Sequence, residues 1–528
     1  MIDPDVVVLS RMQFALTALY HFLFVPLTLG LSWMLVIMES VYVMTGREIW
    51  KRITQYWGVL FGINFAMGVA TGITMEFQFG TNWAYYSHYV GDIFGVPLAL
   101  EGIMAFFLES TFIGLFFFGW DRLSRVAHLV VTFLVALGGS LSAVWILIAN
   151  AWMQSPVGAE FNPETLRMEV TDFTAVVFNP VAQSKFVHTV SAGYVVGAMF
   201  VLSISAWYLL RGRNIEFAKR SMTVAASFGL ASALSVVVLG DESGYTMTEH
   251  QKMKLAAIEA MWETEPAPAP FTLFGWPDLE QRTTHYAVRI PWVMGLIGTR
   301  SIDQVMPGID TLVEHAEQRI RNGLTAWTAL QRLRETPGDE EALATFRAHE
   351  DDLGYALLLK RSLQDPTTAS EADIVAAADS TVPNVPVLFW SFRIMVACGF
   401  WFIALFGWAF WLSARRQLER PIFLRFALWS LPLPWLAAEL GWIVAEYGRQ
   451  PWAIEGVLPT ALGVSSVSVG QVGTSLAGFA IFYTLLAVVD AVLMVKYVRK
   501  GPDGLGMWPP KDPEPVPDQS TLEANPVH

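Results

Sequence analysis

Long apolar stretches separated by short polar loops dominate the chain. Nine of these stretches are about 20 residues long or longer, and about 20 apolar residues is the length that crosses a bilayer as an α-helix. They lie at residues 13–43, 57–79, 96–119, 126–152, 186–211, 220–239, 387–412, 423–446 and 473–497. The pattern therefore predicts an all-α fold, a polytopic membrane helix bundle with nine transmembrane helices.

Lysine and arginine are distributed unevenly between the short loops. The loops after the first, third, fifth and seventh stretches each carry at least two of them, whereas residues 80–95 carry none and residues 447–472 carry only Arg449. Cytoplasmic loops of membrane proteins are enriched in these residues. The distribution predicts an N-terminus outside the cytoplasm and a C-terminus inside it.

One connection is far longer than the others. Residues 241–386 are polar and carry two amphipathic helical patterns, near residues 309–335 and 339–361. A structureless loop of this length would be unusual, so we expect a small helical cap outside the cytoplasm. The chain then divides into six transmembrane helices at 1–240, the cap at 241–386, three transmembrane helices at 387–500 and a disordered cytoplasmic tail at 501–528.

Composition narrows the class of protein further. The chain is 54% hydrophobic and only 15% charged, as expected of a membrane protein. Its net charge of −13 argues against nucleic acid as a partner. Because Cys398 is the single cysteine, an intrachain disulfide and a cysteine-ligated zinc or iron–sulfur site are excluded. The N-terminus lacks the basic region of a signal peptide, so we expect the first apolar stretch to remain as a transmembrane helix.

Two glutamates close the eighth apolar stretch. Glu439 and Glu446 are about two helical turns apart and share a face. Gly448 and Pro451 then end the helix, with Arg449 in its last turn. A carboxylate inside an apolar span normally pairs, protonates or binds a ligand. A structural ion pair with Arg449 and a ligand role for Glu446 are the two interpretations.

Other apolar stretches carry polar or sulfur-bearing residues of the kinds that bind metals or protons. With a rise of about 1.5 Å per residue, the predicted orientation brings most of them into the outer half of the membrane. They are His21, Glu101, Glu109, His188, Arg393 and Met395. A structural role is the alternative for each, since an intramembrane His can bond a neighbouring helix and Met commonly fills a core. We interpret the remaining histidines as solvated or structural: His88, His128, His250, His285, His315 and His349.

Taken together, the histidines, Met395 and Glu446 predict haem that is bound without covalent attachment. The chain has no Cys-x-x-Cys-His motif for covalent haem and no Walker A motif for ATP. His188 with Met395 would fill both axial positions of an electron-transfer haem. A lone His21 or a lone Glu446 would leave an iron position open, which O2 chemistry requires.

Several motifs resemble subunit I of the cytochrome bd-type ubiquinol oxidases, over nearly the whole chain. They are residues 13–30 (QFALTALYHFLFVPLTLG), 75–83 (MEFQFGTNW), 240–245 (GDESGY), 392–400 (FRIMVACGF) and 441–452 (GWIVAEYGRQPW). The catalytic subunit of that family has nine spans and an outside N-terminus. The long segment at 241–386 is similar to the long quinol-loop branch of the family.

The resemblance implies a set of cofactors and their ligands. His188 and Met395 would ligate a low-spin haem b. His21 and Glu446 would be the proximal ligands of two high-spin haems, one b and one d, and we favour His21 for haem d. Arg393 and Arg449 would contact propionates or stabilise reduced haem.

The resemblance also implies the route of quinol and of protons. Lys254 and Glu259, in the sequence QKMKLAAIE at 251–259, match the quinol-loop motif of the family. Glu101 would lie beside the high-spin pair, with Glu109 on a proton route to it. Burial raises the pKa of a carboxyl group in general, so both could carry protons.

The implied function is that of a terminal respiratory oxidase in the bacterial inner membrane. Quinol would be oxidised at the outer face and O2 reduced to water, so that charge separates without a pump. The implied partners are a second large membrane subunit, one or more small single-span subunits and membrane lipid. Two alternatives remain open: a haem b quinol dehydrogenase subunit that does not reduce O2, and a proton-coupled secondary transporter.

Overall fold

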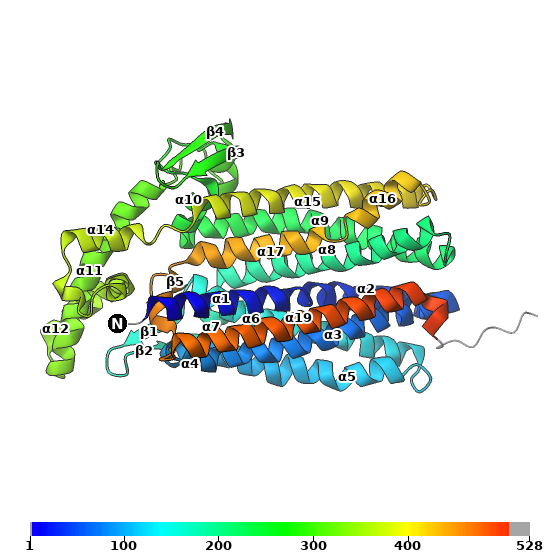
Figure 1. Ribbon diagram of the computed structural model, residues 1–528, viewed down its shortest axis with the longest axis horizontal. Helices are drawn as coiled ribbons and strands as arrows, with labels where there is room; N and C mark the ends of the chain where they lie inside the picture. Colours follow the sequence, from blue (N-terminus) through cyan, green and yellow to red (C-terminus); the bar gives the residue numbers. More distant parts are fainter. Residues whose placement is uncertain (1–2, 506–528) are drawn as a thin grey trace, which may run out of the picture.

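The computed structural model describes residues 3–505; the greater part of the expected tail, residues 506–528, lies outside the described residues. Within residues 3–505, nine helical segments are long and apolar enough to cross a membrane, which confirms the predicted fold class. They pack side by side in one bundle, and the segment between the sixth and seventh covers one end of it (Figure 1). We call this segment, residues 251–384, the cap, and the end that it covers the cap end.

The bundle consists of long helices joined by short connections. In chain order these helices are α1 (Pro4–Phe22), α2 (Val25–Thr45), α3 (Glu48–Thr81), α4 (Ala84–Leu100), the π-helix η1 (Glu101–Phe106), α5 (Phe107–Phe118), α6 (Arg125–Gln154), α8 (Pro180–Leu210), α9 (Ile215–His250), α15 (Val385–Ala414), α16 (Pro421–Trp429), α17 (Leu433–Glu446) and α19 (Val469–Lys500).

Three of the predicted spans are interrupted, although the apolar pattern gave each as one continuous stretch. The first breaks between α1 and α2 at Leu23, and the eighth breaks between α16 and α17 at residues 430–432. A proline lies at or just after each break, Pro26 and Pro432, and proline cannot donate the helical hydrogen bond. The third span changes from α- to π-helix at Glu101, a local widening that is frequent at functional sites.

Helices α4 and α9 extend furthest beyond the apolar stretches that predicted them. Residues 80–95 were expected to form a loop, but α4 already begins at Ala84. Similarly, α9 continues to His250, although its apolar stretch ends at residue 239. In both cases the added turns contain polar residues and pack against neighbouring elements, so hydropathy alone does not reveal them.

The cap is mixed in structure. The predicted helix at 309–335 is confirmed as α11 (Ile309–Glu335). The helix expected at 339–361 is broken into α12 (Glu340–His349), η3 (Glu350–Asp352), α13 (Leu353–Leu357) and η4 (Leu358–Arg361). The chain turns there because Arg319 and Asn322 of α11 both donate to the Asp352 carboxylate. The other helical elements of the cap are α10 (Lys252–Glu259), η2 (Gly295–Thr299), η5 (Pro366–Thr368) and α14 (Glu371–Asp379).

The cap also contains a β-hairpin that the sequence analysis did not anticipate. Strand β3 (Phe271–Asp278) pairs with the antiparallel β4 (Thr283–Ile290), with two irregularities in register near Phe274. Small two-stranded sheets and short helices complete the cap end: β1 (Ala159–Asn162) with β2 (Arg167–Val170), β5 (Trp452–Ile454) with β6 (Leu458–Pro459), α7 (Phe173–Val177), α18 (Thr460–Gly463) and η6 (Tyr447–Arg449). The short η7 (Pro502–Leu505) follows α19.

Close helix packing in the centre of the bundle depends on glycine. A β-carbon built on Gly30 of α2 would lie 2.4 Å from the carbonyl oxygen of Gly193 on α8, and one on Gly197 would lie 2.6 Å from the α-carbon of Gly30. The backbones of α2 and α8 therefore touch, a mode of packing that is common in membranes. This contact fixes α8, which carries His188, against the second helix of the first span.

Candidate functional site

His21 lies in the last turn of α1, directly before the break. Its Nδ1 is 2.9 Å from Oγ1 of Thr71 on α3. The Thr71 hydroxyl already donates to the carbonyl oxygens of Met67 and Gly68, so it accepts a hydrogen bond from Nδ1. Nε2 is then left with its lone pair, which is the form of histidine that binds a metal. A β-carbon on Gly72 would lie 3.2 Å from the His21 ring, so glycine leaves room for it.

His188 and Met395 lie on two helices that face each other across a four-helix unit. Helix α8, with His188, packs against α9 and α17, and α15, with Met395, packs against the same two helices. By contrast, α8 and α15 hardly touch in the described part of the chain. The two residues are about 12 and 15 Å along their helices from the cap-end starts, at 1.5 Å per residue.

The surroundings of this pair are small or apolar. Gly240 of α9 faces the His188 ring, and a β-carbon there would lie 3.2 Å from Cε1. Nδ1 of His188 is buried without a hydrogen-bond partner among residues 3–505. Gly441 of α17 faces Met395, with its β-carbon position 3.2 Å from the sulfur. An imidazole and a thioether on opposite helices can hold one iron from both sides.

Glu446 closes α17 and receives donors from three directions. Its Oε2 accepts from Arg449 at 2.6 Å, the ion pair that the sequence suggested. Its Oε1 accepts from Asn150 at 3.1 Å and Gln154 at 2.9 Å, both on α6, and lies 3.3 Å from Nζ of Lys185 on α8. The carboxylate therefore lies where three helices meet, surrounded by two cationic and two amide side chains. The same donors can also hold the acidic groups of a cofactor.

Helix α17 connects the surroundings of His21 with those of Glu446. Trp435 of α17 donates through Nε1 to the carbonyl of Leu23, which the break after α1 leaves free. Trp442 packs against Phe22 with ring centroids 5.1 Å apart, and Nζ of Lys185 lies 5.1 Å from the Trp442 ring. Glu439 shares the α17 face with Glu446, but neither of its buried carboxylate oxygens has a hydrogen-bond partner within residues 3–505.

Glu101 and Glu109 both face α6. Glu101 begins η1 and accepts from the Ser142 hydroxyl at 2.7 Å. Glu109 is 7% exposed and packs against two glycines of α6; a β-carbon on Gly139 would lie 2.7 Å from its Oε1. The two carboxyl groups thus lie about one turn apart along the same neighbouring helix. A regular α-helix would separate them by about 80° around its axis, and the π-helical turn between them changes that angle.

Lys254 lies in the first turn of α10 and Glu259 is its last residue, but they point to different partners. The Glu259 carboxylate is buried and accepts from Arg393 at 3.0 Å. Arg393 also donates to the carbonyl oxygens of Ile258 and Thr272 and so joins the cap to α15. Burial raises the pKa of Glu259, and the charge of Arg393 opposes this rise. The structure therefore pairs Arg393, which was expected near haem, with a cap residue.

Nζ of Lys254 turns toward Glu446 instead. It donates to Gln154, Gln251 and the carbonyl of Ala445 at 2.7 to 2.9 Å. Burial lowers the pKa of Lys254 to about 7, and the nearby charge of Lys185 acts in the same direction.

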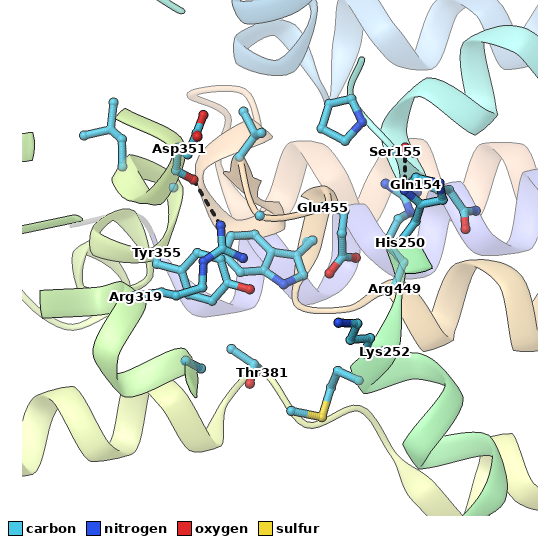
Figure 2. Close-up of a pocket in the computed structure, with 18 of the residues that line it drawn as sticks. Gln154, Ser155, His250, Lys252, Arg319, Asp351, Tyr355, Thr381, Arg449 and Glu455 are labelled. Carbon is cyan, nitrogen blue, oxygen red and sulfur yellow. Dashed lines mark hydrogen bonds between the residues drawn. The ribbon is translucent and has the colours of Figure 1, made fainter. Parts of the chain in front are cut away.

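Lys254 lines a cavity of about 630 Å³ between the cap and the end of the bundle. Figure 2 shows Gln154, His250 and Arg449 on one side of it and Arg319 and Tyr355 of the cap on the other. Glu455 projects between them, and burial raises the pKa of its carboxyl to about 6. Within residues 3–505 no group of three or more His, Cys, Asp or Glu side chains converges as a metal site.

Residues 9–502 match the family model described as cytochrome bd terminal oxidase subunit I. This chain belongs to that family. It is 52% identical over 502 residues to the cytochrome bd-II ubiquinol oxidase subunit 1 of Escherichia coli (strain K12), an alignment that covers 95% of this chain and 98% of that protein. It is 35% identical over 496 residues to the cytochrome bd ubiquinol oxidase subunit 1 of Bacillus subtilis (strain 168), covering 94% of both chains.

A solved structure agrees with the fold of this cytochrome bd subunit I. The bd oxidase of Geobacillus thermodenitrificans contains a chain that superimposes with a TM-score of 0.76 at 25% identity, covering 95% of this chain and 100% of that one. Membership of a terminal oxidase family makes this multi-pass membrane chain an oxidoreductase component.

Sequence reasoning missed several residues around the site of this cytochrome bd subunit I. Asn150 and Gln154 were not singled out, although their spacing of four at the end of an apolar stretch places them on one helix face. Lys185, directly before the fifth stretch, was a further available signal. The sequence gives no signal for Thr71 or Glu455, because their importance depends on partners far away in the sequence. Of the two roles allowed for His128, solvated or structural, the structure shows the second: it is buried and hydrogen-bonded to Glu39 at 2.6 Å.

Proposed function

We propose that this chain is the catalytic, haem-bearing subunit of an electrogenic quinol:O2 oxidoreductase of the cytochrome bd type. The observation that carries the proposal is the state of His21, whose Nδ1 is anchored on Thr71 so that Nε2 keeps its lone pair. A single protein ligand of this kind leaves the opposite position on an iron open for O2. The relatives named ubiquinol oxidases support quinol as the reductant.

Three haems would be held by the four ligands at the cap end of the bundle. His188 and Met395, on the diagonal helices α8 and α15, would hold a low-spin haem b that accepts single electrons. His21 would hold haem d and Glu446 a second, high-spin haem b. When bound, these groups supply the electron transfer and O2 chemistry that amino-acid side chains lack. Arg449 and Lys185 would neutralise propionates at that site.

Quinol would be oxidised where the cap meets α15. Each quinol that becomes quinone gives up two electrons and two protons. Glu259 is the proposed proton acceptor because its carboxylate is buried where the cap meets α15. The charge of Arg393 favours the ionised form of this carboxylate, which is the form that accepts a proton. Lys254, near the other end of α10, would orient the quinol headgroup or stabilise negative charge near Glu446.

Protons for water formation would arrive from the opposite side of the membrane. Four electrons from two quinols and four protons reduce one O2 to two waters. Glu109 and Glu101, which face α6 about one turn apart, would pass these protons toward the His21 and Glu446 sites. Release of quinol protons on one side and uptake on the other separates charge without a pump.

The predicted orientation completes this proposal. The cap would lie outside the cytoplasm of a bacterial inner membrane, with the N-terminus outside and the C-terminus inside. The proposed domain boundaries at residues 240, 386 and 500 separate the first six spans, the cap, the last three spans and the tail. A second large subunit and one or more small single-span subunits would assemble with the chain in the lipid bilayer, as the designation subunit 1 of the relatives suggests.

A visible spectrum of the purified complex tests the proposal directly. We expect haem b and haem d absorption in the reduced protein and an O2-dependent reoxidation with quinol as donor. Absorption of haem b without haem d would favour a quinol dehydrogenase subunit. Absence of haem in protein that is purified with its partner subunits would favour a transporter and overturn the proposal.

A further inference from the structure

The exposed apolar surface of the cap is concentrated in one segment, residues 271–305. Its members are at least 39% exposed: Leu273, Phe274, Trp276, Leu279, Tyr286, Val288, Ile290, Trp292, Leu296, Ile297, Ile302 and Val305. The cap helix α11, in contrast, buries its apolar positions. Scattered single apolar residues are normal on a protein surface, whereas exposed apolar residues that are concentrated in one segment indicate an interaction site.

Contacts to α15 establish how deep the hairpin lies. The carbonyl of Thr272 accepts from Arg393, which is about 12 Å along α15 from its cap-end start at 1.5 Å per residue. Phe274 and Trp276 both contact Trp390, nearer to the start of that helix. The base of the hairpin therefore reaches beside the first turns of an apolar transmembrane helix, and Figure 1 shows the hairpin on the flank of the bundle there.

The opposite end of the hairpin points back into the cap. Arg282, in its turn, pairs with Asp310 of α11 and Asp379 of α14 at 2.7 and 2.8 Å. The hairpin is thus oriented with its charged turn toward the cap and its apolar base toward the bundle.

Contacts with helix α9 place η2, the turn that follows the hairpin, at a similar depth to the base of the hairpin. Arg300 pairs with Asp241 and Glu242, the first polar residues after the apolar stretch of α9 that ends at 239. Residues 291–298, with the sequence PWVMGLIG, contain no charged residue. η2 packs on α9, so Leu296 and Ile297 lie at the level where the apolar surface of that helix begins.

We propose that residues 286–298 form an interfacial membrane anchor, in which the exposed side chains of β4 and η2 contact lipid at the boundary between headgroups and acyl chains. The occupant of this surface is the bilayer because the patch continues the exposed apolar surface of α9, where Val237 and Val238 are 43% and 69% exposed. Tryptophan and tyrosine prefer this depth because their rings are amphipathic. Such an anchor does not depend on the proposed oxidase chemistry.

A spin label at Ile297 tests the anchor in the complete complex reconstituted into phosphatidylcholine vesicles. Cys398→Ser removes the single cysteine of the chain, and Ile297→Cys then carries the nitroxide; Trp292→Cys serves as a second position. The matched control is Val375→Cys on α14, which is 42% exposed on the cap helices away from this surface. The Cys398→Ser parent without an added cysteine reports any label on partner subunits.

We expect the ratio of collision rates with O2 to those with a water-soluble nickel chelate to be several-fold higher at Ile297 than at Val375, since O2 concentrates in apolar phases. The same result at Trp292 supports the anchor if Ile297→Cys does not assemble. Equal ratios at Ile297 and Val375 would overturn the proposal in favour of a water-exposed surface. A label at Ile297 that is shielded from both reagents would overturn it in favour of a protein partner.

Discussion

His21 and Thr71 are joined by one hydrogen bond, and that bond determines which ring nitrogen of the histidine stays available. The sequence was sufficient to single out His21, because an imidazole in an apolar stretch is costly and rare. It could not indicate Thr71, which lies on another helix and looks like any threonine in a membrane span. The same holds for Asn150 and Lys185 around Glu446: residue type and depth single out candidate ligands, whereas their supporting partners depend on packing.

Replacement of Thr71 by valine should weaken the His21 site. Thr71→Val removes the acceptor that holds Nδ1 and leaves the ring free to rotate, and loss of such a partner typically costs about 10- to 100-fold in metal affinity or activity. We expect a shifted or diminished haem d band and slower O2 reduction. Thr74→Val is the matched control, since its hydroxyl lies one turn away and bonds Tyr483. Equal spectra for the two variants would contradict the role of Thr71.

Glu259 should control the quinol half of the reaction. Burial raises the pKa of its carboxyl, and only the ionised form accepts a proton, so turnover with quinol should rise with pH as the carboxyl ionises. Glu259→Gln should abolish this pH step and slow quinol oxidation by about 100-fold, as for loss of a general base. Artificial one-electron donors should still support O2 reduction. Glu263→Gln, a change at an exposed carboxylate nearby, should leave both activities intact, and equal losses with both donors in Glu259→Gln would place the damage at the haems.

At the scale of helices and strands, hydropathy was sufficient for the number and rough position of the spans because each must cover the same hydrocarbon thickness. It did not reveal where a span breaks. The interruption after His21 and the π-helix at Glu101 change which way side chains point without changing how apolar the segment is. The hairpin β3–β4 was missed for a related reason, since it depends on Arg393 and Trp390 of a helix more than a hundred residues later.

The two acidic residues of the third span, Glu101 and Glu109, both face helix α6, and this arrangement leads to a prediction about proton delivery. Glu109→Gln keeps the shape and hydrogen bonding of the side chain but removes the exchangeable acid. If Glu109 passes protons, electrons should still reach the high-spin haems, while steady turnover falls by about 100-fold or more. A flash measurement of electron arrival together with turnover in vesicles separates the two steps. Ser110→Ala, at an exposed neighbouring position, is the control, and normal turnover in Glu109→Gln would leave this residue a structural role.

At the scale of the whole molecule, the cap is held on the bundle by a few close contacts. The salt bridge of Arg393 with Glu259 is one of them. Another joins α13 to the loop between β5 and β6: a β-carbon on Gly354 would lie 2.1 Å from the carbonyl oxygen of Gly456. This loop also carries Glu455 and forms one wall of the cavity between cap and bundle. The length of the cap could be predicted from the sequence, but these contacts between the cap and the bundle could not.

Gly354→Ala should therefore loosen the cap without unfolding the bundle. The added methyl meets backbone, which cannot move aside as a side chain would, and overpacking of this kind costs about 1–3 kcal/mol. We expect faster proteolytic cleavage within residues 336–340, between α11 and α12, and a haem spectrum like that of the unaltered protein. Ala344→Val, on the exposed face of α12, controls for added volume. A cleavage rate unchanged from the unaltered protein would mean that this contact does not hold the cap.

The carboxylate of Glu446 gathers its donors from α6, α8 and the end of α17, and this has a consequence for biogenesis. A ribosome delivers His21 almost at the start of synthesis, whereas Glu446 and Arg449 emerge only when the eighth span leaves the exit tunnel. Until then Lys185 lacks its counterion, and the side-chain amides of Asn150 and Gln154 lack the carboxylate that accepts from them. The pocket around Glu446 can therefore close only after nearly the whole chain has been translated, and the haem that we propose for it would be loaded late, into a bundle that has already been inserted.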